Sequence, residues 1–289
     1  MAGPAGRLSI GRPAWQWRAP STEGAAKPST DLENPLRMLC AVLAVAIVAY
    51  GLWTVAQMDR DVVIGYFGMD YRIYLVATIR WMNGYSFYEL YQLAGPYIIH
   101  TPDVLYPPIL IWLMVPFTVL PASLWWGIPI GLSSWTVLHL RPTPIVWPLL
   151  ALCVVWPQTI TDVIAGNPGL WALAAMSLGV LFAGPAVFVL VKPSLAPFAL
   201  WGMRHRRWWL WLAVFGALSL PFGALWLQWV TALANSNGTL AYSLNEVPVL
   251  LIPVIAWLGR SGSVRSRSSR ERPIQRTIGA QIRGIAPRL

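Results

Sequence analysis

Residues 38–57, MLCAVLAVAIVAYGLWTVAQ, form an apolar run without a single charged side chain. About 20 such residues are enough to cross a bilayer as one helix. Because 56% of the chain is hydrophobic and only 11% is charged, we predict an all-α polytopic membrane protein. With this run included, we expect about eight transmembrane helices. The other apolar segments are residues 106–120, 122–140, 145–164, 170–182, 185–201, 208–228 and 247–258.

Basic residues are concentrated in two places, which predict the orientation of the chain. One is Arg204-His205-Arg206-Arg207, and the other runs from Arg260 onward, with eight arginines against one acid, Glu271. Basic segments beside membrane helices usually mark the cytoplasmic side. We therefore predict a multi-pass protein of the cell membrane with both termini in the cytoplasm, whereas Arg141 falls on the outer side.

This orientation divides the chain into three parts. Residues 1–35 are expected to be a disordered cytoplasmic tail, residues 36–259 the membrane domain, and residues 260–289 a basic cytoplasmic tail. Nucleic-acid binding by the arginine-rich tail is an alternative, but a topology signal explains the same charge. We therefore predict the lipid bilayer, and no nucleic acid, as a partner.

The predicted external loop, residues 58–105, is the candidate catalytic region. It holds five of the eleven acidic residues in the chain, together with three arginines. Residues 69–83 are predicted to form a mostly apolar helix that ends at Gly84 and lies in the membrane interface. Asp70 occupies its first turn, and Arg72 and Arg80 share one helical face because they are eight residues apart.

Asp70 has two interpretations. A carboxylate at the interface can act as a general base on an acceptor hydroxyl, while arginines stabilise a phosphate leaving group. Alternatively, Asp70 is an ordinary residue of a helix N-terminus, paired with Arg72 or Arg60.

Asp59-Arg60-Asp61 also allows two interpretations. An Asp-x-Asp pair can bind a divalent metal, but charged residues also end a membrane helix. We favour the second interpretation, and we predict no metal site and no cofactor.

Several short motifs occur in a recognisable order. They are Asp70-Tyr71-Arg72-Ile73-Tyr74, Asn83-Gly84-Tyr85-Ser86-Phe87-Tyr88, Tyr106-Pro107-Pro108, Gly166-Asn167, Val191-Lys192-Pro193 and Arg206-Arg207-Trp208. Over residues 38–260 this order resembles glycosyltransferase family 87. That family belongs to the GT-C superfamily of membrane enzymes and includes polyprenyl-phosphate-mannose-dependent alpha-mannosyltransferases, which usually have more spans than the eight predicted here.

The resemblance implies a function and a set of site residues. It implies a hexosyltransferase that moves a hexose, mannose above all, from a polyprenyl-phosphate donor to a glycan or glycolipid acceptor on the outer face. Asp70 would be the catalytic base of an inverting, metal-independent transfer. Arg72, Arg80, Tyr106 and Lys192 would bind the substrates.

Lys192 and Tyr106 each have a structural interpretation as well as a functional one. Lys192 either pairs with a donor phosphate or extends to the membrane interface, and Tyr106 either lines the site or anchors its span.

The alternative function of the chain is a transporter or flippase for a lipid or small solute, which broken helices and a lysine within an apolar span also fit.

Overall fold

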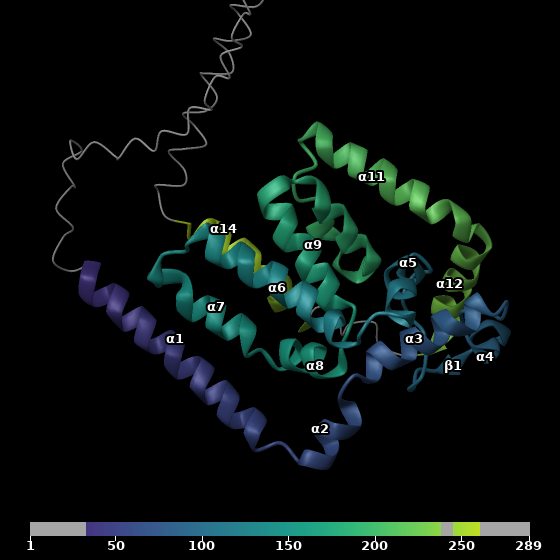
Figure 1. The fold of residues 1–289 in the computed structure, drawn as a ribbon, viewed down its shortest axis with the longest axis horizontal. Helices are drawn as coiled ribbons and strands as arrows, with labels where there is room; N and C mark the ends of the chain where they lie inside the picture. The colour runs from purple at the N-terminus through teal and green to yellow at the C-terminus, as the bar shows by residue number, and fades with distance from the viewer. Residues whose placement is uncertain (1–32, 238–244, 261–289) are drawn as a thin grey trace, which may run out of the picture.

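The computed structural model describes residues 33–237 and 245–260. The predicted tails, residues 1–35 and 260–289, therefore lie outside the described residues except for residues 33–35, which begin a helix, and Arg260. The described part is mostly helical (Figure 1), which confirms the predicted helical class. Its α-helices are α1 (Glu33–Ala56), α2 (Arg60–Tyr66), α3 (Met69–Met82), α4 (Leu90–Ala94), α5 (Leu110–Met114), α6 (Ser123–Leu140), α7 (Trp147–Val154), α8 (Pro157–Ala165), α9 (Gly169–Phe182), α10 (Ala196–Ala199), α11 (Arg206–Ser219), α12 (Gly223–Asn235) and α14 (Val247–Leu258).

Shorter elements complete the fold. The longest of the described 3₁₀ helices is η3 (Gly184–Val191). The strands β1 (Tyr97–Ile98) and β2 (Ser236–Asn237) pair in parallel, with Tyr97 opposite Ser236. This pair joins the end of α12 to the loop after α4, where the Tyr97 hydroxyl also donates to the Ala232 carbonyl at 3.0 Å.

Several helices are long and apolar enough to cross a membrane. Three stretches qualify in the described residues: Asn34–Ala56, Arg60–Met82 and Arg206–Asn235. A fourth span is possible if Pro144–Val154 and Pro157–Ala165, which meet at a bend of 58°, are counted together. By the length and composition of these helices the chain is a membrane protein, whereas its predicted eight spans are not all matched by long helices.

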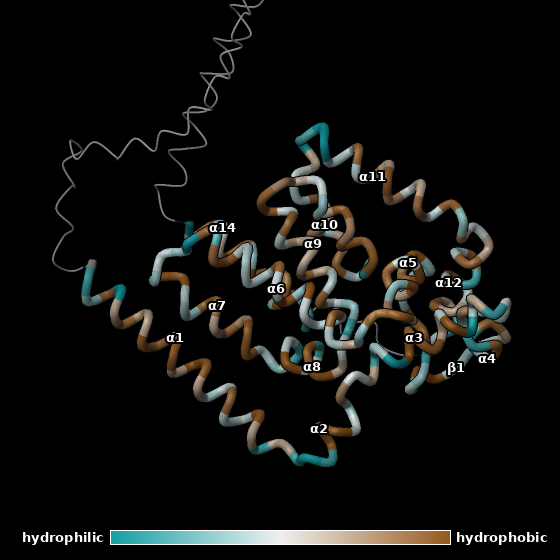
Figure 2. Tube along the Cα trace, in the orientation of Figure 1, coloured by the Kyte–Doolittle hydropathy of each residue, from teal (hydrophilic) through white to brown (hydrophobic). Residues whose placement is uncertain are grey.

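Helix α1 lies at one edge of the molecule and packs mainly on α7 (Figure 1). Gly51 allows the close approach, because a β-carbon there would overlap the side chain of Val155. Most other side chains of α1 are exposed although apolar, as expected of a helix that faces lipid. Figure 2 shows the hydrophilic residues concentrated near the turns at either end of the helices.

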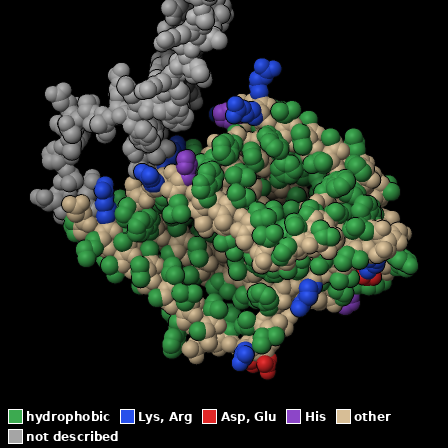
Figure 3. All heavy atoms as spheres, in the orientation of Figure 1, with side chains coloured by type: hydrophobic (Ala, Val, Ile, Leu, Met, Phe, Trp, Pro, Cys, Tyr) green, Lys and Arg blue, Asp and Glu red, His purple; other side chains and the backbone are tan. Residues whose placement is uncertain are grey.

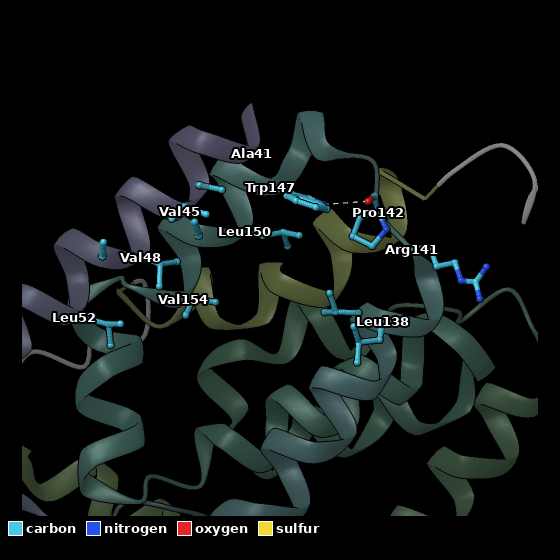
Figure 4. Close-up of a pocket in the computed structure, with 14 residues that line it drawn as sticks. Ala41, Val45, Val48, Leu52, Leu138, Arg141, Pro142, Trp147, Leu150 and Val154 are labelled. Carbon is cyan, nitrogen blue, oxygen red and sulfur yellow. Dashed lines mark hydrogen bonds between the residues drawn. The ribbon is translucent and has the colours of Figure 1, made fainter. Parts of the chain in front are cut away.

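An apolar groove of about 770 Å³ follows the contact between α1 and α7 (Figure 4). Ala41, Val45 and Leu52 line one wall, and Leu150 and Val154 line the other. Asp70 is not among its lining residues, so this groove is separate from the predicted catalytic loop.

The chain runs back and forth between two ends of the molecule. We call them the basic end, which holds Arg141, Arg204–Arg207 and Arg260, and the Asp70 end. Pro142 and Arg260 form a β-bridge, and a single hollow is lined by both Arg204–Arg207 and Arg260. Figure 3 shows part of this basic surface. The passes between the two ends are α1, α6, α7 with α8, α9, α11 with α12, and α14.

Residues 184–201 form a hairpin, although the sequence predicted a span there. The chain enters η3 at the basic end, reaches Lys192, and returns through α10. The two ends of the hairpin are close, since a β-carbon on Gly202 would come within 2.6 Å of the Ala183 β-carbon. Pro185, Pro193 and Pro197 interrupt the helical hydrogen bonding that a straight span would need.

The segment 106–120 likewise forms only α5 and a short 3₁₀ turn at Val115–Thr118. Removing residues 106–120 as a pass changes the end at which Arg141 lies, and removing the hairpin as well keeps Arg204–Arg207 at that same end. The Thr143 amide donates to the Gly259 carbonyl at 2.8 Å, so Arg141 lies beside Arg260. The prediction that Arg141 lies apart from the other basic residues is therefore wrong.

The predicted helix at residues 69–83 is confirmed as α3, which ends at Met82 with Asn83 as its C-cap, followed by Gly84 with φ of 84°. The predicted interfacial helix is, however, part of the stretch Arg60–Met82 that also has the length and composition of a span. Gly68, with φ of 66°, separates α2 from α3 within that stretch.

We predict that labelling from one side of the membrane will separate the two ends. In a variant lacking Cys40 and Cys153, single cysteines at exposed Ile145 and Met203 should react with an impermeant maleimide from the same side. A cysteine at exposed Tyr85 should react only from the other side. The eight-span path instead places Ile145 with Tyr85, and labelling in that pattern would contradict the structure.

Candidate functional site

Asn167 lies at the centre of a polar cluster at the Asp70 end. Its Nδ2 donates to Asp70 Oδ2 at 2.6 Å. Its Oδ1 accepts from the Tyr106 hydroxyl at 2.8 Å, from Lys192 Nζ at 3.0 Å and from the Gly169 amide at 2.7 Å. Since every contact of Oδ1 is with a donor and Nδ2 faces a carboxylate, only one orientation of the amide satisfies all of them.

The turn between α8 and α9 positions Asn167. Helix α8 ends at Gly166, whose φ of 69° is a conformation that glycine adopts without strain. A β-carbon on Gly166 would come within 2.6 Å of the Trp126 side chain, so glycine is required for packing as well. The indole of Trp125 donates to the Gly166 carbonyl at 2.7 Å and fixes the turn.

Lys192 reaches the cluster from the tip of the hairpin. Its Nζ lies 2.5 Å from Glu246 Oε1, and the two side chains are only 4% and 2% exposed. The ammonium also lies 5.3 Å from the centroid of the Tyr106 ring. Of the two interpretations of Lys192, extension to the interface does not fit this buried position.

The cluster contains more carboxyl groups than cations. Asp70, Asp162 and Glu246 all interact electrostatically with Lys192. Asp162 Oδ2 and Glu246 Oε2 are buried without a hydrogen-bond partner among the described residues. Burial raises the pKa of the Glu246 carboxyl above its usual value, and the Lys192 ammonium partly opposes that rise.

The polar atoms converge on Gly169. A β-carbon there would come within 2.9 Å of Asn167 Oδ1, 3.2 Å of Asp162 Oδ2 and 3.3 Å of Lys192 Nζ. Any larger residue at this position would therefore displace the cluster.

Asp162 and Glu246 are site residues that the sequence alone did not single out. Both lie within or next to apolar segments, where an ionisable side chain is costly and indicates a functional or structural role. The sequence shows that Asp162 and Glu246 are ionisable residues in apolar surroundings, but it does not show which residues they contact.

The predicted arginines of α3 do not join the cluster. Arg72 is exposed, and its nearest described partner is the Gly65 carbonyl at 3.5 Å. It lies on the far side of α3 from Asp70, because two residues correspond to about 200° of helical rotation.

Arg80 instead holds the turn after α3. Its guanidinium donates to the Ser86 and Phe87 carbonyls, each at 2.7 Å, and pairs with the Glu89 carboxylate. These contacts occupy the N–H groups that were predicted to bind the substrate phosphate.

Asp59 has a local structural role. Its carboxylate accepts from the Asp61 amide at 2.9 Å and caps the N-terminus of α2. This agrees with our preferred interpretation of the Asp59-Arg60-Asp61 sequence, in which the charges mark a helix boundary.

Comparison with known proteins gives no relative for this arrangement. No protein-family model, curated protein or solved structure matches the chain. The fold and the cluster thus define a helical membrane protein with a buried polar site, and its function is argued from that site.

We predict unequal costs for removing the two partners of the buried ion pair. Lys192→Met leaves three carboxyl groups without their shared cation, whereas Glu246→Gln leaves Lys192 near Asp70 and Asp162. Breaking a buried pair typically costs about 3–5 kcal/mol. Lys192→Met should therefore lower the melting temperature of the detergent-purified protein more than Glu246→Gln does.

The double variant Lys192→Met, Glu246→Gln provides the control for this comparison. It should recover part of the loss caused by Lys192→Met, because it removes one uncompensated carboxylate. If Glu246→Gln is the more damaging single change, Lys192 is not the shared partner of the three carboxyl groups.

Proposed function

We propose that this protein is an integral-membrane glycosyltransferase that moves a hexose from a polyprenyl-phosphate carrier to an acceptor hydroxyl, with Asp70 as general base. The supporting observation is that Asp70, Tyr106, Asn167 and Lys192, each from a different motif of the family 87 resemblance, are linked by hydrogen bonds through Asn167. Motifs that are short and separate in the sequence thus meet at the amide of Asn167, which contacts the Asp70 carboxylate.

The chemistry of the transfer assigns each of these residues a part. One oxygen of Asp70 accepts the proton of the acceptor hydroxyl as that oxygen bonds to the anomeric carbon of the hexose. The bond from that carbon to the phosphate oxygen breaks, and the polyprenyl phosphate leaves with the electron pair. Asn167 orients the carboxylate, while Tyr106 and Lys192 orient Asn167.

We place the donor lipid at the side of Asp70 that is not covered by Asn167. Asp70 is only partly buried, so an acceptor can approach it from that side. Arg80 is engaged with Glu89 and Arg72 lies on the opposite face of α3, so neither arginine is assigned to the donor phosphate. The six passes put Asp70 at the end opposite the basic residues, and we therefore assign this end to the outer face.

We predict that Asp70→Asn will reduce transfer by about 10²–10⁴-fold, the usual contribution of a general base. The assay would use membranes that express the protein and a radiolabelled polyprenyl-phosphate mannose or glucose. Asp61→Asn is a matched control, because Asp61 is an exposed carboxylate in the neighbouring helix α2. Undiminished transfer by Asp70→Asn, at equal expression, would exclude Asp70 as the base.

The second candidate function is transport of a lipid or small solute. The observation that favours it is that one carboxylate oxygen each of Asp162 and Glu246 has no hydrogen-bond partner among the described residues, beside a lysine at the tip of a hairpin. Ionisable groups buried in membrane proteins often bind coupling ions or protons.

Reconstituted vesicles distinguish the two functions. A transporter should move a fluorescent lipid or solute at a rate that Asp70→Asn leaves unchanged and Glu246→Gln reduces. A glycosyltransferase should lose transfer with Asp70→Asn and keep it with Glu246→Gln. It should not move the probe faster than vesicles without protein do.

A further inference from the structure

A second hollow lies at the basic end, on the far side of the molecule from Asp70. Its volume is about 1050 Å³. The walls come from the end of α9, the turn before α11, the first residues of α11 and the end of α14. The basic residues that line it are Arg204, His205, Arg206, Arg207 and Arg260.

The charge of Arg204, Arg206 and Arg207 is not balanced by an acidic partner in the described part of the protein. No acidic residue is among its lining residues. Among residues 33–237 and 245–260, Arg204, Arg206 and Arg207 form no ion pair or side-chain hydrogen bond, and all three are exposed. Arg260 stacks on the ring of Trp257, with its guanidinium carbon 3.9 Å from the ring centroid.

The surroundings indicate which anion would be bound. Trp209 and Leu210, in the first turn of α11, are exposed by 59% and 64% immediately beside the arginines. Trp201 and Trp257 line the hollow itself and pack edge to face at 5.0 Å. Tryptophans next to arginines at the end of apolar helices are typical of the level of lipid headgroups.

We propose that the hollow binds the phosphate of an anionic phospholipid headgroup. A topology signal alone requires positive charge at this end but no concave site, whereas the hollow gathers arginines from segments more than fifty residues apart in the chain. Arginine binds phosphate through paired N–H donors, and the exposed apolar side chains of α11 would lie along the acyl chains. This site is distinct from the proposed donor site at Asp70 and does not depend on it.

The test is a titration of the purified full chain, in neutral detergent, with short-chain phosphatidylglycerol, followed by native mass spectrometry. Each arginine near a membrane surface contributes roughly a fivefold factor in affinity for anionic lipid. Arg204→Gln with Arg207→Gln should therefore weaken lipid binding by about twentyfold or more. Phosphatidylcholine should bind no more weakly to this variant than to the unchanged protein.

Two further variants keep the result interpretable. Arg60→Gln with Arg141→Gln removes the same charge from outside the hollow and should leave binding unchanged. Arg204→Lys with Arg207→Lys retains the charge and should recover most of the binding. Equal losses in both glutamine variants, or no loss in either, would overturn the proposal, as would inorganic phosphate competing as well as phosphatidylglycerol does.

Discussion

The amide of Asn167 is the contact on which the site depends. Its nitrogen donates to Asp70, and its oxygen accepts from Tyr106, Lys192 and the backbone of Gly169. These partners come from α3, from the segment before α5, from the tip of the hairpin and from α9. A side chain that joins four segments in this way fixes their relative positions, because each buried polar group is costly to leave unpaired. Asp70 remains partly exposed, and the proposed chemistry uses its exposed side.

The hairpin at residues 184–201 explains how a lysine can be buried in this site. Lys192 occupies its tip, where the backbone reverses between two 3₁₀ turns, and Glu246 meets it from the start of α14. Irregular backbone within a membrane protein is tolerated where other parts of the protein cover it. Because the hairpin returns to the end from which it entered, it also removes one pass from the predicted path. With residues 106–120 folded back as well, Arg141, Arg204–Arg207 and Arg260 come to lie at one end.

The sequence was sufficient to predict the helical class and the helix α3, and it singled out Asp70, Tyr106 and Lys192, which the structure brings together around Asn167. It did not predict that Arg72 and Arg80 lie away from Asp70, although helical geometry places position 72 on the opposite face of α3. The partners Asp162 and Glu246 depend on which helices pack together, and apolar segments of similar composition do not reveal that. The hairpin was missed because residues 185–201 have nearly the length of a span, and only the packing of Ala183 against Gly202 shows that the chain turns back.

The most direct test of the central claim, that Asn167 holds Asp70 ready for chemistry, is a double-mutant cycle on the transfer rate with Tyr106→Phe and Asn167→Ala. Tyr106→Phe removes only the hydroxyl that donates to Asn167 Oδ1. If Tyr106 acts through Asn167, its removal slows transfer in the unchanged protein and has no further effect once Asn167 is alanine. Equal losses from Tyr106→Phe in both backgrounds, or full activity of Asn167→Ala, would contradict the account.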